Sequence, residues 1–329
     1  MTLAVDASSI RSGGCLAHLN GVLRHAQPYQ YGFDKVFVWC NPVAANYLGL
    51  LKNNNMVIVP QMSLSGSFRQ LAMWQTFTLP HLIGEIKPDV LWSPGGIFFG
   101  RCRVPTVMMS QNLLPFESVE MARYGMTAIR LKFLLLRQVQ INVFKKAQKI
   151  IFLSKYARDR VLRYIPEIAD KAAVIPHGID AQFFAKPRQP DWGGRKRPIR
   201  LLYVSTADYY KHQWNVVKAV ELLVRQGYDV VLDLVGSAYP PALKKLQQTI
   251  AVSPVSARIH YRGSILHAEL AAYYHQGIYL YLRQRVKLFP LLFWKPWPRV
   301  SRLPAVIVNR CRKCWEMPAF ILIPNIRKK

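Results

Sequence analysis

The sequence has few acidic residues. Its 329 residues include 17 Asp and Glu against 45 Lys and Arg, which gives a formal net charge of +28. Such an excess favours anionic partners, for example phosphates or an acidic membrane surface. No motif of an RNA- or DNA-binding fold accompanies the charge, so nucleic acid is not an expected partner.

Long apolar runs and paired cysteines are also scarce. No run of 18 apolar residues occurs, so a transmembrane helix is not expected. The first residues, Met1–Asp6, lack the basic-then-apolar pattern of a signal peptide. Three of the five cysteines stand alone, and the Cys311–Cys314 pair has no second pair or histidine cluster to complete a zinc site. These features favour a cytoplasmic protein and predict neither a bound metal nor a cofactor.

Acidic residues almost disappear after residue 276. Residues 277–329 hold twelve Lys and Arg against Glu316 alone, a charge of +11, which leaves +17 for the first 276 residues. This stretch also contains six prolines and three of the eight tryptophans. Its prolines are spaced to break helices and central strands, and its apolar residues show no usable periodicity. We interpret residues 277–329 as an aberrant basic tail that is read out of frame.

Before the tail, short apolar runs alternate with amphipathic segments, a pattern typical of an α/β fold with a mainly parallel sheet. The pattern predicts a first domain over residues 1–185, a linker over residues 186–198 rich in Pro, Gly, Arg and Lys, and a partial second domain over residues 199–276. In the first domain the expected strands are Thr2–Asp6, Val36–Cys40, Met56–Pro60, Asp89–Pro94, Thr106–Ser110 and Lys149–Leu153, and the expected helices are Leu16–His25, Phe68–Glu85, Met126–Gln148 and Lys155–Tyr164. In the second, strands are expected at Arg200–Ser205, Asp229–Val235 and Arg258–Arg262, and helices at Trp214–Gln226, Pro241–Ala251 and His267–Tyr274.

Several short motifs follow the predicted strands in a fixed order. Residues 12–14 read Ser-Gly-Gly, residues 152–157 read Phe-Leu-Ser-Lys-Tyr-Ala, and residues 175–180 read Ile-Pro-His-Gly-Ile-Asp. In the second domain, residues 202–205 read Leu-Tyr-Val-Ser and are followed by Lys-His-Gln at 211–213. Supporting matches are Leu-Val-Gly at 234–236, Tyr-Arg-Gly-Ser at 261–264 and Glu-Leu at 269–270.

In the order and spacing of these motifs, residues 1–276 resemble the retaining glycosyltransferases of family 4, which have the GT-B fold. The resemblance implies two Rossmann-like doubly wound domains that face a cleft, the second of them incomplete here. It implies transfer of a sugar from a nucleotide-sugar donor to a glycan or lipid-linked acceptor, as in the synthesis of bacterial surface polysaccharides such as lipopolysaccharide. No metal is implied.

The resemblance assigns the donor site to Gly13, Gly14, Ser205, Lys211 and Gly236. Glycines after a strand let backbone N–H groups approach a phosphate or a sugar, although Gly13 and Gly14 fit an ordinary strand-to-helix turn equally well. Lys211 would meet the donor pyrophosphate as a point charge, and its alternative is a solvated surface lysine. Relatives often carry an arginine shortly before this lysine, but residues 206–210 are Thr-Ala-Asp-Tyr-Tyr.

Gln111 and Asn112 are the candidate residues at the reacting sugar. Many relatives have a histidine where Gln111 stands. Neither amide can act as a general base, but both can hydrogen-bond sugar hydroxyls. In the retaining mechanism that the resemblance implies, the departing phosphate takes the acceptor proton. His177 and Gly178 match the turn that leads into the interdomain hinge, where a purely structural turn is the alternative.

The predicted helix Met126–Gln148 carries both leucines and basic residues. A basic amphipathic helix can lie on an anionic membrane surface, and a core helix with a basic outer face is the alternative. Peripheral attachment to the inner face of a membrane is therefore a second possible localisation.

The genetic code tests the interpretation of the tail. Relatives carry two glutamates with seven residues between them in the second domain, and this pair is missing after Glu269. Shifting the frame by one base forces Glu at the Trp294/Lys295 junction, and it permits Glu eight positions earlier at Val286/Lys287. It also forces Leu at Phe293/Trp294 and Ala at Trp297/Pro298. The shifted frame restores the missing pair, so we expect a frameshift near Gln276 and an impaired transferase. The alternatives are an inactive remnant that only binds membranes, or a basic nucleic-acid-binding protein.

Overall fold

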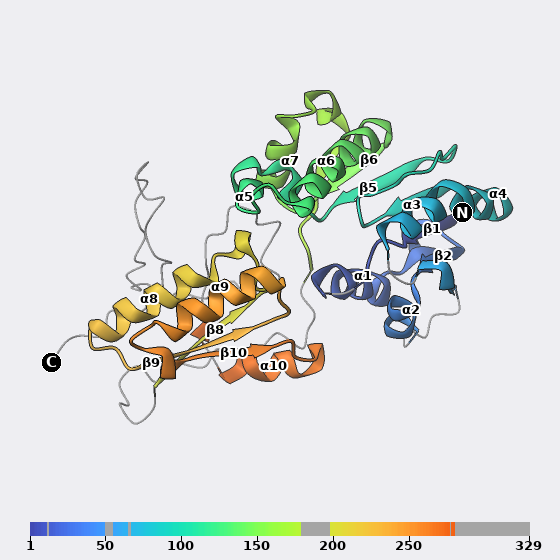
Figure 1. Ribbon diagram of the computed structural model, residues 1–329. Coiled ribbons are helices and arrows are strands. Elements are labelled where there is room, and N and C mark those ends of the chain that lie inside the picture. Colours follow the sequence, from blue (N-terminus) through green and yellow to red (C-terminus); the bar gives the residue numbers. More distant parts are fainter. Residues whose placement is uncertain (12, 50–54, 65–66, 179–197, 277, 280–329) are drawn as a thin grey trace. The chain divides into compact units, whose positions relative to one another are not determined.

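The computed structural model describes residues 1–11, 13–49, 55–64, 67–178, 198–276 and 278–279 (Figure 1). These residues fall into two compact units, residues 1–178 and residues 198–279. In each unit parallel strands alternate with helices. The predicted linker and tail lie outside the described residues, apart from Pro198 and residues 278–279.

In the described part of the first unit, seven parallel strands form one sheet in the order β3-β2-β1-β4-β5-β6-β7. The chain winds outward from β1 to β3 and then returns to place β4 on the other side of β1. The switch point of the fold therefore lies between β1 and β4, where folds of this kind bind ligands at the carboxyl ends of the strands. The strands are β1 (Thr2–Ala7), β2 (Lys35–Cys40), β3 (Met56–Pro60), β4 (Val90–Ser93), β5 (Thr106–Ser110), β6 (Lys149–Phe152) and β7 (Ala172–Val174).

Three helices of the first unit, α2, α3 and α7, begin at polar residues whose side chains cap the first turn. Asn41, Ser67 and Ser154 each accept a hydrogen bond from a backbone N–H of the first turn that would otherwise lack a partner. Ser67 and Gln70 form a complete capping box. The helices are α1 (Gly13–His25), α2 (Pro42–Leu48), α3 (Phe68–Met73), α4 (Leu79–Ile86), α5 (Ser118–Ala122), α6 (Ala128–Lys146) and α7 (Lys155–Leu162).

The predicted helix over Phe68–Glu85 is confirmed, but it is not α-helical throughout. A π-helical turn, η3 (Trp74–Thr78), separates α3 from α4, and the Leu79 N–H donates to the carbonyl of Trp74. Pro80 explains the change, because its ring has no N–H and clashes with the carbonyl four residues earlier. Gln75 lies in this π-helical turn, and its side chain points into the protein interior, where it is fully buried.

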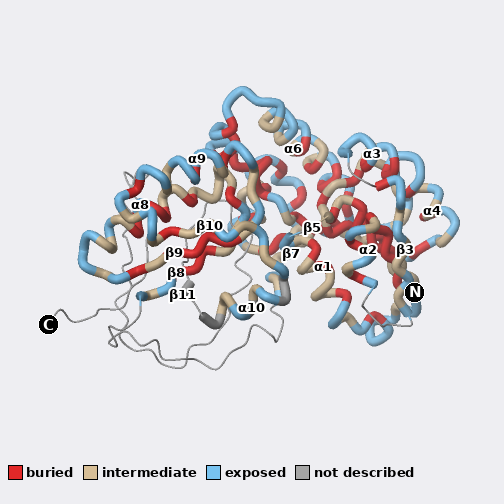
Figure 2. Tube along the Cα trace, turned by 60° about the horizontal axis from the view of Figure 1, so that its bottom comes forward, coloured by how far each residue is buried: buried red, intermediate tan, exposed pale blue. Residues whose placement is uncertain are grey.

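The second unit is smaller. Its described strands are β8 (Ile199–Val204), β9 (Val230–Val235), β10 (Ile259–Gly263) and β11 (Ile278–Tyr279), in the order β10-β9-β8-β11. The helices α8 (Gln213–Arg225), α9 (Pro240–Ala251) and α10 (His267–Gln276) connect them. Leu201, Leu232 and Val216 belong to one buried core between the strands and helices. In both units the buried residues concentrate in the strands and on the inner faces of the helices (Figure 2).

The predicted elements are otherwise confirmed, with bounds that differ by a few residues. The short elements α2, α5, β7 and β11 were not predicted. Among the described residues, no helix is long and apolar enough to cross a membrane.

Candidate functional site

A buried carboxyl group lies at the switch point of the first sheet. Asp6, near the end of β1, has no exposed surface. Its oxygens accept hydrogen bonds from the Ser8 N–H (3.1 Å), the Ser8 hydroxyl and Gln75 Nε2 (2.8 Å). Burial raises the pKa of Asp6 to about 6, although these hydrogen bonds act in the opposite direction.

Gln75 ties three segments together at this point. Besides Asp6, its Nε2 lies 3.0 Å from the Ser8 hydroxyl and 3.1 Å from the carbonyl of Ile97, in the loop after β4. The π-helical turn, the end of β1 and the β4 loop are therefore held by one amide group. Sequence reasoning missed this network, because its only signal was a polar residue inside an apolar helical pattern.

Other polar groups gather on the same side of the sheet. Buried side-chain atoms without a hydrogen-bond partner among the described residues include the hydroxyls of Ser9 and Ser110 and both amide atoms of Gln140. Ser9 follows β1, Ser110 ends β5, and Gln140 lies on α6. Native proteins leave few such atoms unpaired, and those that remain often mark functional or hydrated places. The carboxyl edge of the first sheet thus has unused hydrogen-bonding capacity.

His177 lies at this edge and contacts α1. Its ring centroid is 4.0 Å from that of His18, and the two rings are tilted by 54°. The strand order places β4, β5 and β6 between β1 and β7, so the segment after β7 must return across the sheet to reach α1 (Figure 1). Burial lowers the pKa of both histidines to about 4, so both are neutral at pH 7. The prediction for His177 did not include this partner.

The other predicted residues of the first unit lie at the carboxyl ends of the strands. Gly13 opens α1 with a φ of +68°, a conformation that favours glycine, and a Cβ on Gly13 or Gly14 would meet nothing within 4 Å. Open space therefore faces this helix start, as a phosphate or sugar contact would require. Gly178 has no positive φ and no close neighbour at its Cβ position, so the structure gives no steric reason for glycine there.

Gln111 and Asn112 follow β5. The Asn112 side-chain oxygen accepts the Leu114 N–H at 3.1 Å, which fixes the turn, and Asn112 is exposed. Gln111 Nε2 lies 3.3 Å from the Met109 sulfur. Farther along the same loop, the buried Glu117 pairs with Arg160 of α7 at 3.2 Å. The loop is thereby anchored beside the candidate amides.

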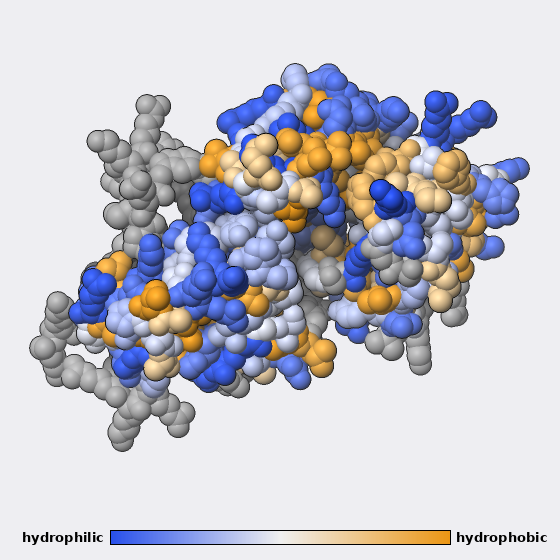
Figure 3. All heavy atoms as spheres, in the orientation of Figure 1, coloured by the Kyte–Doolittle hydropathy of each residue, from blue (hydrophilic) through white to orange (hydrophobic). Residues whose placement is uncertain are grey.

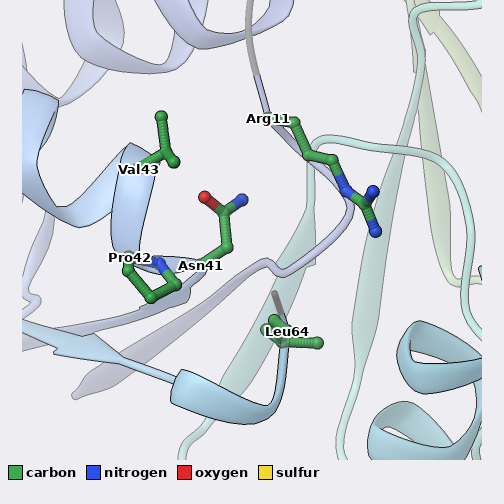
Figure 4. Close-up of a pocket in the computed structure, with 5 residues that line it drawn as sticks. All are labelled: Arg11, Asn41, Pro42, Val43 and Leu64. Atoms are coloured by element: carbon green, nitrogen blue, oxygen red, sulfur yellow. The ribbon is translucent and has the colours of Figure 1, made fainter. Parts of the chain in front are cut away.

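A cavity of about 190 Å³ lies beyond the ends of β1 and β2 (Figure 4). It is lined by Arg11, Asn41, Pro42, Val43 and Leu64. The Asn41 amide is engaged, since Nδ2 donates to the Ile10 carbonyl at 2.6 Å and Oδ1 caps α2. Arg11 is the charged residue of the lining.

In the second unit, Lys211 lies between the end of β8 and the start of α8. Its ammonium group is 4.7 Å from the ring centroid of Tyr210, and its carbonyl accepts a hydrogen bond from the Tyr203 hydroxyl at 3.1 Å. Burial lowers the pKa of Lys211 to about 8, although the nearby Asp208 carboxylate raises it. At pH 7 Lys211 is therefore still mostly protonated and positively charged. His212, with a φ of +56°, then turns the chain into α8.

Ser205 and Gly236 lie beside each other at the same end of the second sheet. The Ser205 N–H donates to the Val235 carbonyl at 2.8 Å. A Cβ on Gly236 would lie 2.3 Å from the Ser205 carbonyl oxygen, and the φ of Gly236 is +141°, so only glycine fits. Ser205, Lys211 and Gly236 therefore lie at the carboxyl edge of the second sheet.

Aromatic residues fill the region before Lys211 where the resemblance leads to the expectation of an arginine. Tyr209 packs against Tyr239, with ring centroids 5.9 Å apart, and against Trp214 at 6.2 Å. The ammonium group of Lys245, on α9, lies 4.1 Å from the Trp214 ring centroid. Lys245 brings a second cation close to the start of α8, and sequence reasoning missed it.

In the described parts of both units, His, Cys, Asp and Glu do not gather in groups of three that would hold a metal ion.

We compared the sequence and the structure with those of known proteins. Residues 34–183 match the family model of Glycosyltransferase Family 4, and the matched range runs from β2 past His177. The fold is that of the GT-B glycosyltransferases. The predicted class of two Rossmann-like α/β units is thus confirmed. No curated protein sequence matches the chain.

Three solved structures illustrate the GT-B likeness. HepE of Anabaena, in complex with UDP and glucose, is 16% identical with a TM-score of 0.55, over 81% of this chain and 70% of HepE. A glycosyltransferase from Rickettsia africae is 13% identical with a TM-score of 0.54, over 84% and 72% of the two chains. WaaG, a glycosyltransferase involved in lipopolysaccharide biosynthesis, is 12% identical with a TM-score of 0.53, over 82% and 71%.

Proposed function

We propose that this chain descends from a glycosyltransferase that moves a sugar from a nucleotide-sugar donor to a glycan or lipid-linked acceptor during surface-polysaccharide synthesis. The observation that carries the proposal is the half-buried, cationic Lys211 at the carboxyl edge of the second sheet, beside Ser205 and Gly236. The family match of residues 34–183 and the likeness to HepE, whose complex contains UDP and glucose, support it.

The donor diphosphate fits the chemistry of Lys211. An ammonium group that has lost part of its hydration is attracted strongly to a phosphate, and the binding of that anion raises the pKa of the lysine. Gly236 has no side chain, so the backbone at this edge of the sheet stays open to a phosphate. The first unit supplies open backbone at Gly13 and Gly14 and neutral amides at Gln111 and Asn112 for sugar hydroxyls.

The proposed transfer retains the configuration of the sugar. The bond from the sugar C1 to the diphosphate oxygen breaks, and the acceptor hydroxyl oxygen bonds to C1 on the same face. The departing diphosphate takes the proton of that hydroxyl, so no protein base is needed. Gln111 and Asn112 orient the reacting sugar by hydrogen bonds, and the reaction uses no metal.

We further propose that the chain is impaired in this form. The pair of donor-site glutamates expected from the resemblance is absent after Glu269, and the tail in which a shifted frame restores it lies outside the described residues apart from residues 278–279. Resequencing the gene across the codons for Ala271 to Lys329 tests this step. A gained or lost base identifies the tail as an error. An unchanged sequence, followed by equal transfer rates for this chain and for a restored-frame chain, contradicts the frameshift.

Calorimetric titration of this chain separates the parts of the donor. UDP, inorganic pyrophosphate and uridine are titrated in turn. The proposal predicts that UDP and pyrophosphate bind and compete for one site, because Lys211 contacts the phosphates. Binding of uridine with no contribution from the phosphates would contradict the role of Lys211. Absence of binding for every ligand would argue against the donor site as a whole.

A further inference from the structure

Helices α8 and α9 start side by side at the carboxyl edge of the second sheet. They follow the neighbouring strands β8 and β9, and they pack against each other. The loops that lead into them are joined beyond the ends of the strands. The Ala207 N–H donates to the Ser237 carbonyl at 2.7 Å, and the Tyr239 N–H donates to the Ala207 carbonyl at 2.9 Å. The two helix starts are therefore fixed relative to each other, so side chains from both can act on one ligand.

Each helix contributes one lysine that lies against an aromatic ring. Lys211, just before α8, has its ammonium group 4.7 Å from the centroid of the Tyr210 ring. Lys245, in the second turn of α9, has its ammonium group 4.1 Å from the centroid of the Trp214 ring, in the first turn of α8. The Trp214 ring also contacts Tyr209, with the two centroids 6.2 Å apart. Lys245 thus reaches from α9 to the segment that carries Lys211.

A purely structural contact between α8 and α9 is the alternative explanation of the pair formed by Lys245 and Trp214. The charges in this part of the chain favour an anionic ligand instead. The sequence has no acidic residue between Asp233 and Glu269, so α9 carries cations alone. Asp233 is already engaged, because its carboxylate accepts a hydrogen bond from Arg262 at 2.8 Å. Positive charge at the start of α9 is therefore not balanced from within that helix.

Asp208 supplies negative charge near Lys211. Its Oδ1 accepts the Tyr209 N–H at 2.7 Å, and its charge acts on the pKa of Lys211. One carboxylate does not balance the two lysines. Figure 3 shows mostly hydrophilic surface over α8 and α9, with small, separate hydrophobic areas. Such a surface suits a charged ligand better than an apolar partner.

We propose that Lys245 is a second donor-binding residue, which holds one phosphate of the donor diphosphate while Lys211 holds the other. This inference rests on the proposed function and adds a residue to its donor site. Both phosphates carry negative charge, so a separate cation for each attracts the diphosphate more strongly than one lysine does. Trp214 is a positioning residue, because the face of its ring attracts the ammonium group and limits its motion before the ligand binds.

Calorimetric titration of the full chain with inorganic pyrophosphate and with inorganic phosphate tests this proposal. The parent should bind pyrophosphate more tightly than phosphate, because two cations hold its two phosphate groups. Lys245→Met should weaken pyrophosphate binding by about tenfold or more, and phosphate binding much less, because Lys211 still holds one phosphate. Lys245→Arg keeps both the cation and its attraction to an aromatic ring, so it should bind pyrophosphate within about threefold of the parent.

Lys244→Met is the matched control. Lys244 is exposed and precedes Lys245 on α9, and successive side chains of a helix point in different directions. The control removes the same charge from the same helix, so a general loss of positive charge would weaken binding equally in both variants. Pyrophosphate binding in Lys244→Met should equal that of the parent. Circular dichroism checks the fold of each variant, and Lys245→Gln replaces Lys245→Met if that variant does not fold.

The results separate this inference from the proposed function. Pyrophosphate binding at the parental level in Lys245→Met would overturn the inference and leave the donor site at Lys211 intact. Equal weakening of pyrophosphate and phosphate binding would also overturn it, because a damaged fold, and not the loss of one phosphate contact, would then explain the effect. Absence of pyrophosphate binding in the parent would contradict the donor site and this inference together.

Discussion

Asp6 is an ionisable group held where water cannot reach it. Its pKa rises from 3.8 to about 6 on folding, so the folded state keeps a proton that the unfolded state has lost between these pH values. Stability therefore falls as pH rises through this window, by on the order of 3 kcal/mol for a shift of about two pKa units. Above pH 6 Asp6 is ionised in both the folded and the unfolded state, so its effect on the free energy of unfolding no longer changes with pH.

Asp6→Asn removes this ionisation. At pH 7.5 we expect the variant to be more stable than the parent by roughly 1–3 kcal/mol, because Gln75 can turn its unpaired Oε1 towards the new amide. At pH 4 the gain should be largely absent. Denaturant unfolding at both pH values measures the difference. Burial of His18 and His177 lowers their pKa values and acts in the opposite direction, so variant and parent are compared at each pH. A difference that does not change with pH would contradict the account.

At the scale of elements, α2 depends on one side chain. Asn41 caps its first turn through Ala44 N–H at 3.0 Å and satisfies the Ile10 carbonyl at 2.6 Å. Asn41→Ala should lower the free energy of unfolding by about 2 kcal/mol, since it removes a cap and leaves a buried carbonyl unpaired. Asn46→Ala, at an exposed position of the same helix, should change it by less than about 0.5 kcal/mol. Equal effects of the two substitutions in thermal or chemical unfolding would show that the cap is unimportant.

The strands were predictable because each is a short apolar run between turn residues, and Met56–Pro60 and Thr106–Ser110 were predicted to the residue. Helix α2 was missed because it has only seven residues, and β7 because its three residues are not buried. The π-helical turn depends on where Pro80 falls in the helix, which periodicity does not show. The pair His18 and His177 was hidden because its contact joins opposite ends of the first unit.

At the scale of the whole molecule, the motifs placed the candidate residues at the carboxyl edges of the two sheets. Sequence order was sufficient for this, because loops after parallel strands all reach the same edge. The polar network around Asp6 and Gln75 was not predictable, since its members come from separate segments and carry no shared motif. The arginine expected before Lys211 is replaced by Tyr209 and Tyr210, and Lys245 enters the region from another helix.

The positive charge of the molecule comes from two parts of the sequence. The tail contributes +11, and the remaining +17 is spread over the first 276 residues, including the acid-free α6. Restoring the frame would replace the basic tail, whereas the charge of the first 276 residues would remain.

The most direct test of the account is the effect of UDP on thermal unfolding. A ligand that binds the folded chain alone stabilises it by about 2.7 kcal/mol at a hundredfold excess over its Kd. UDP should raise the unfolding midpoint of the parent and of Lys218→Met, whose lysine is exposed on α8, and should fail to do so for Lys211→Met. An equal shift in Lys211→Met, or no shift in the parent, would contradict a donor site at Lys211.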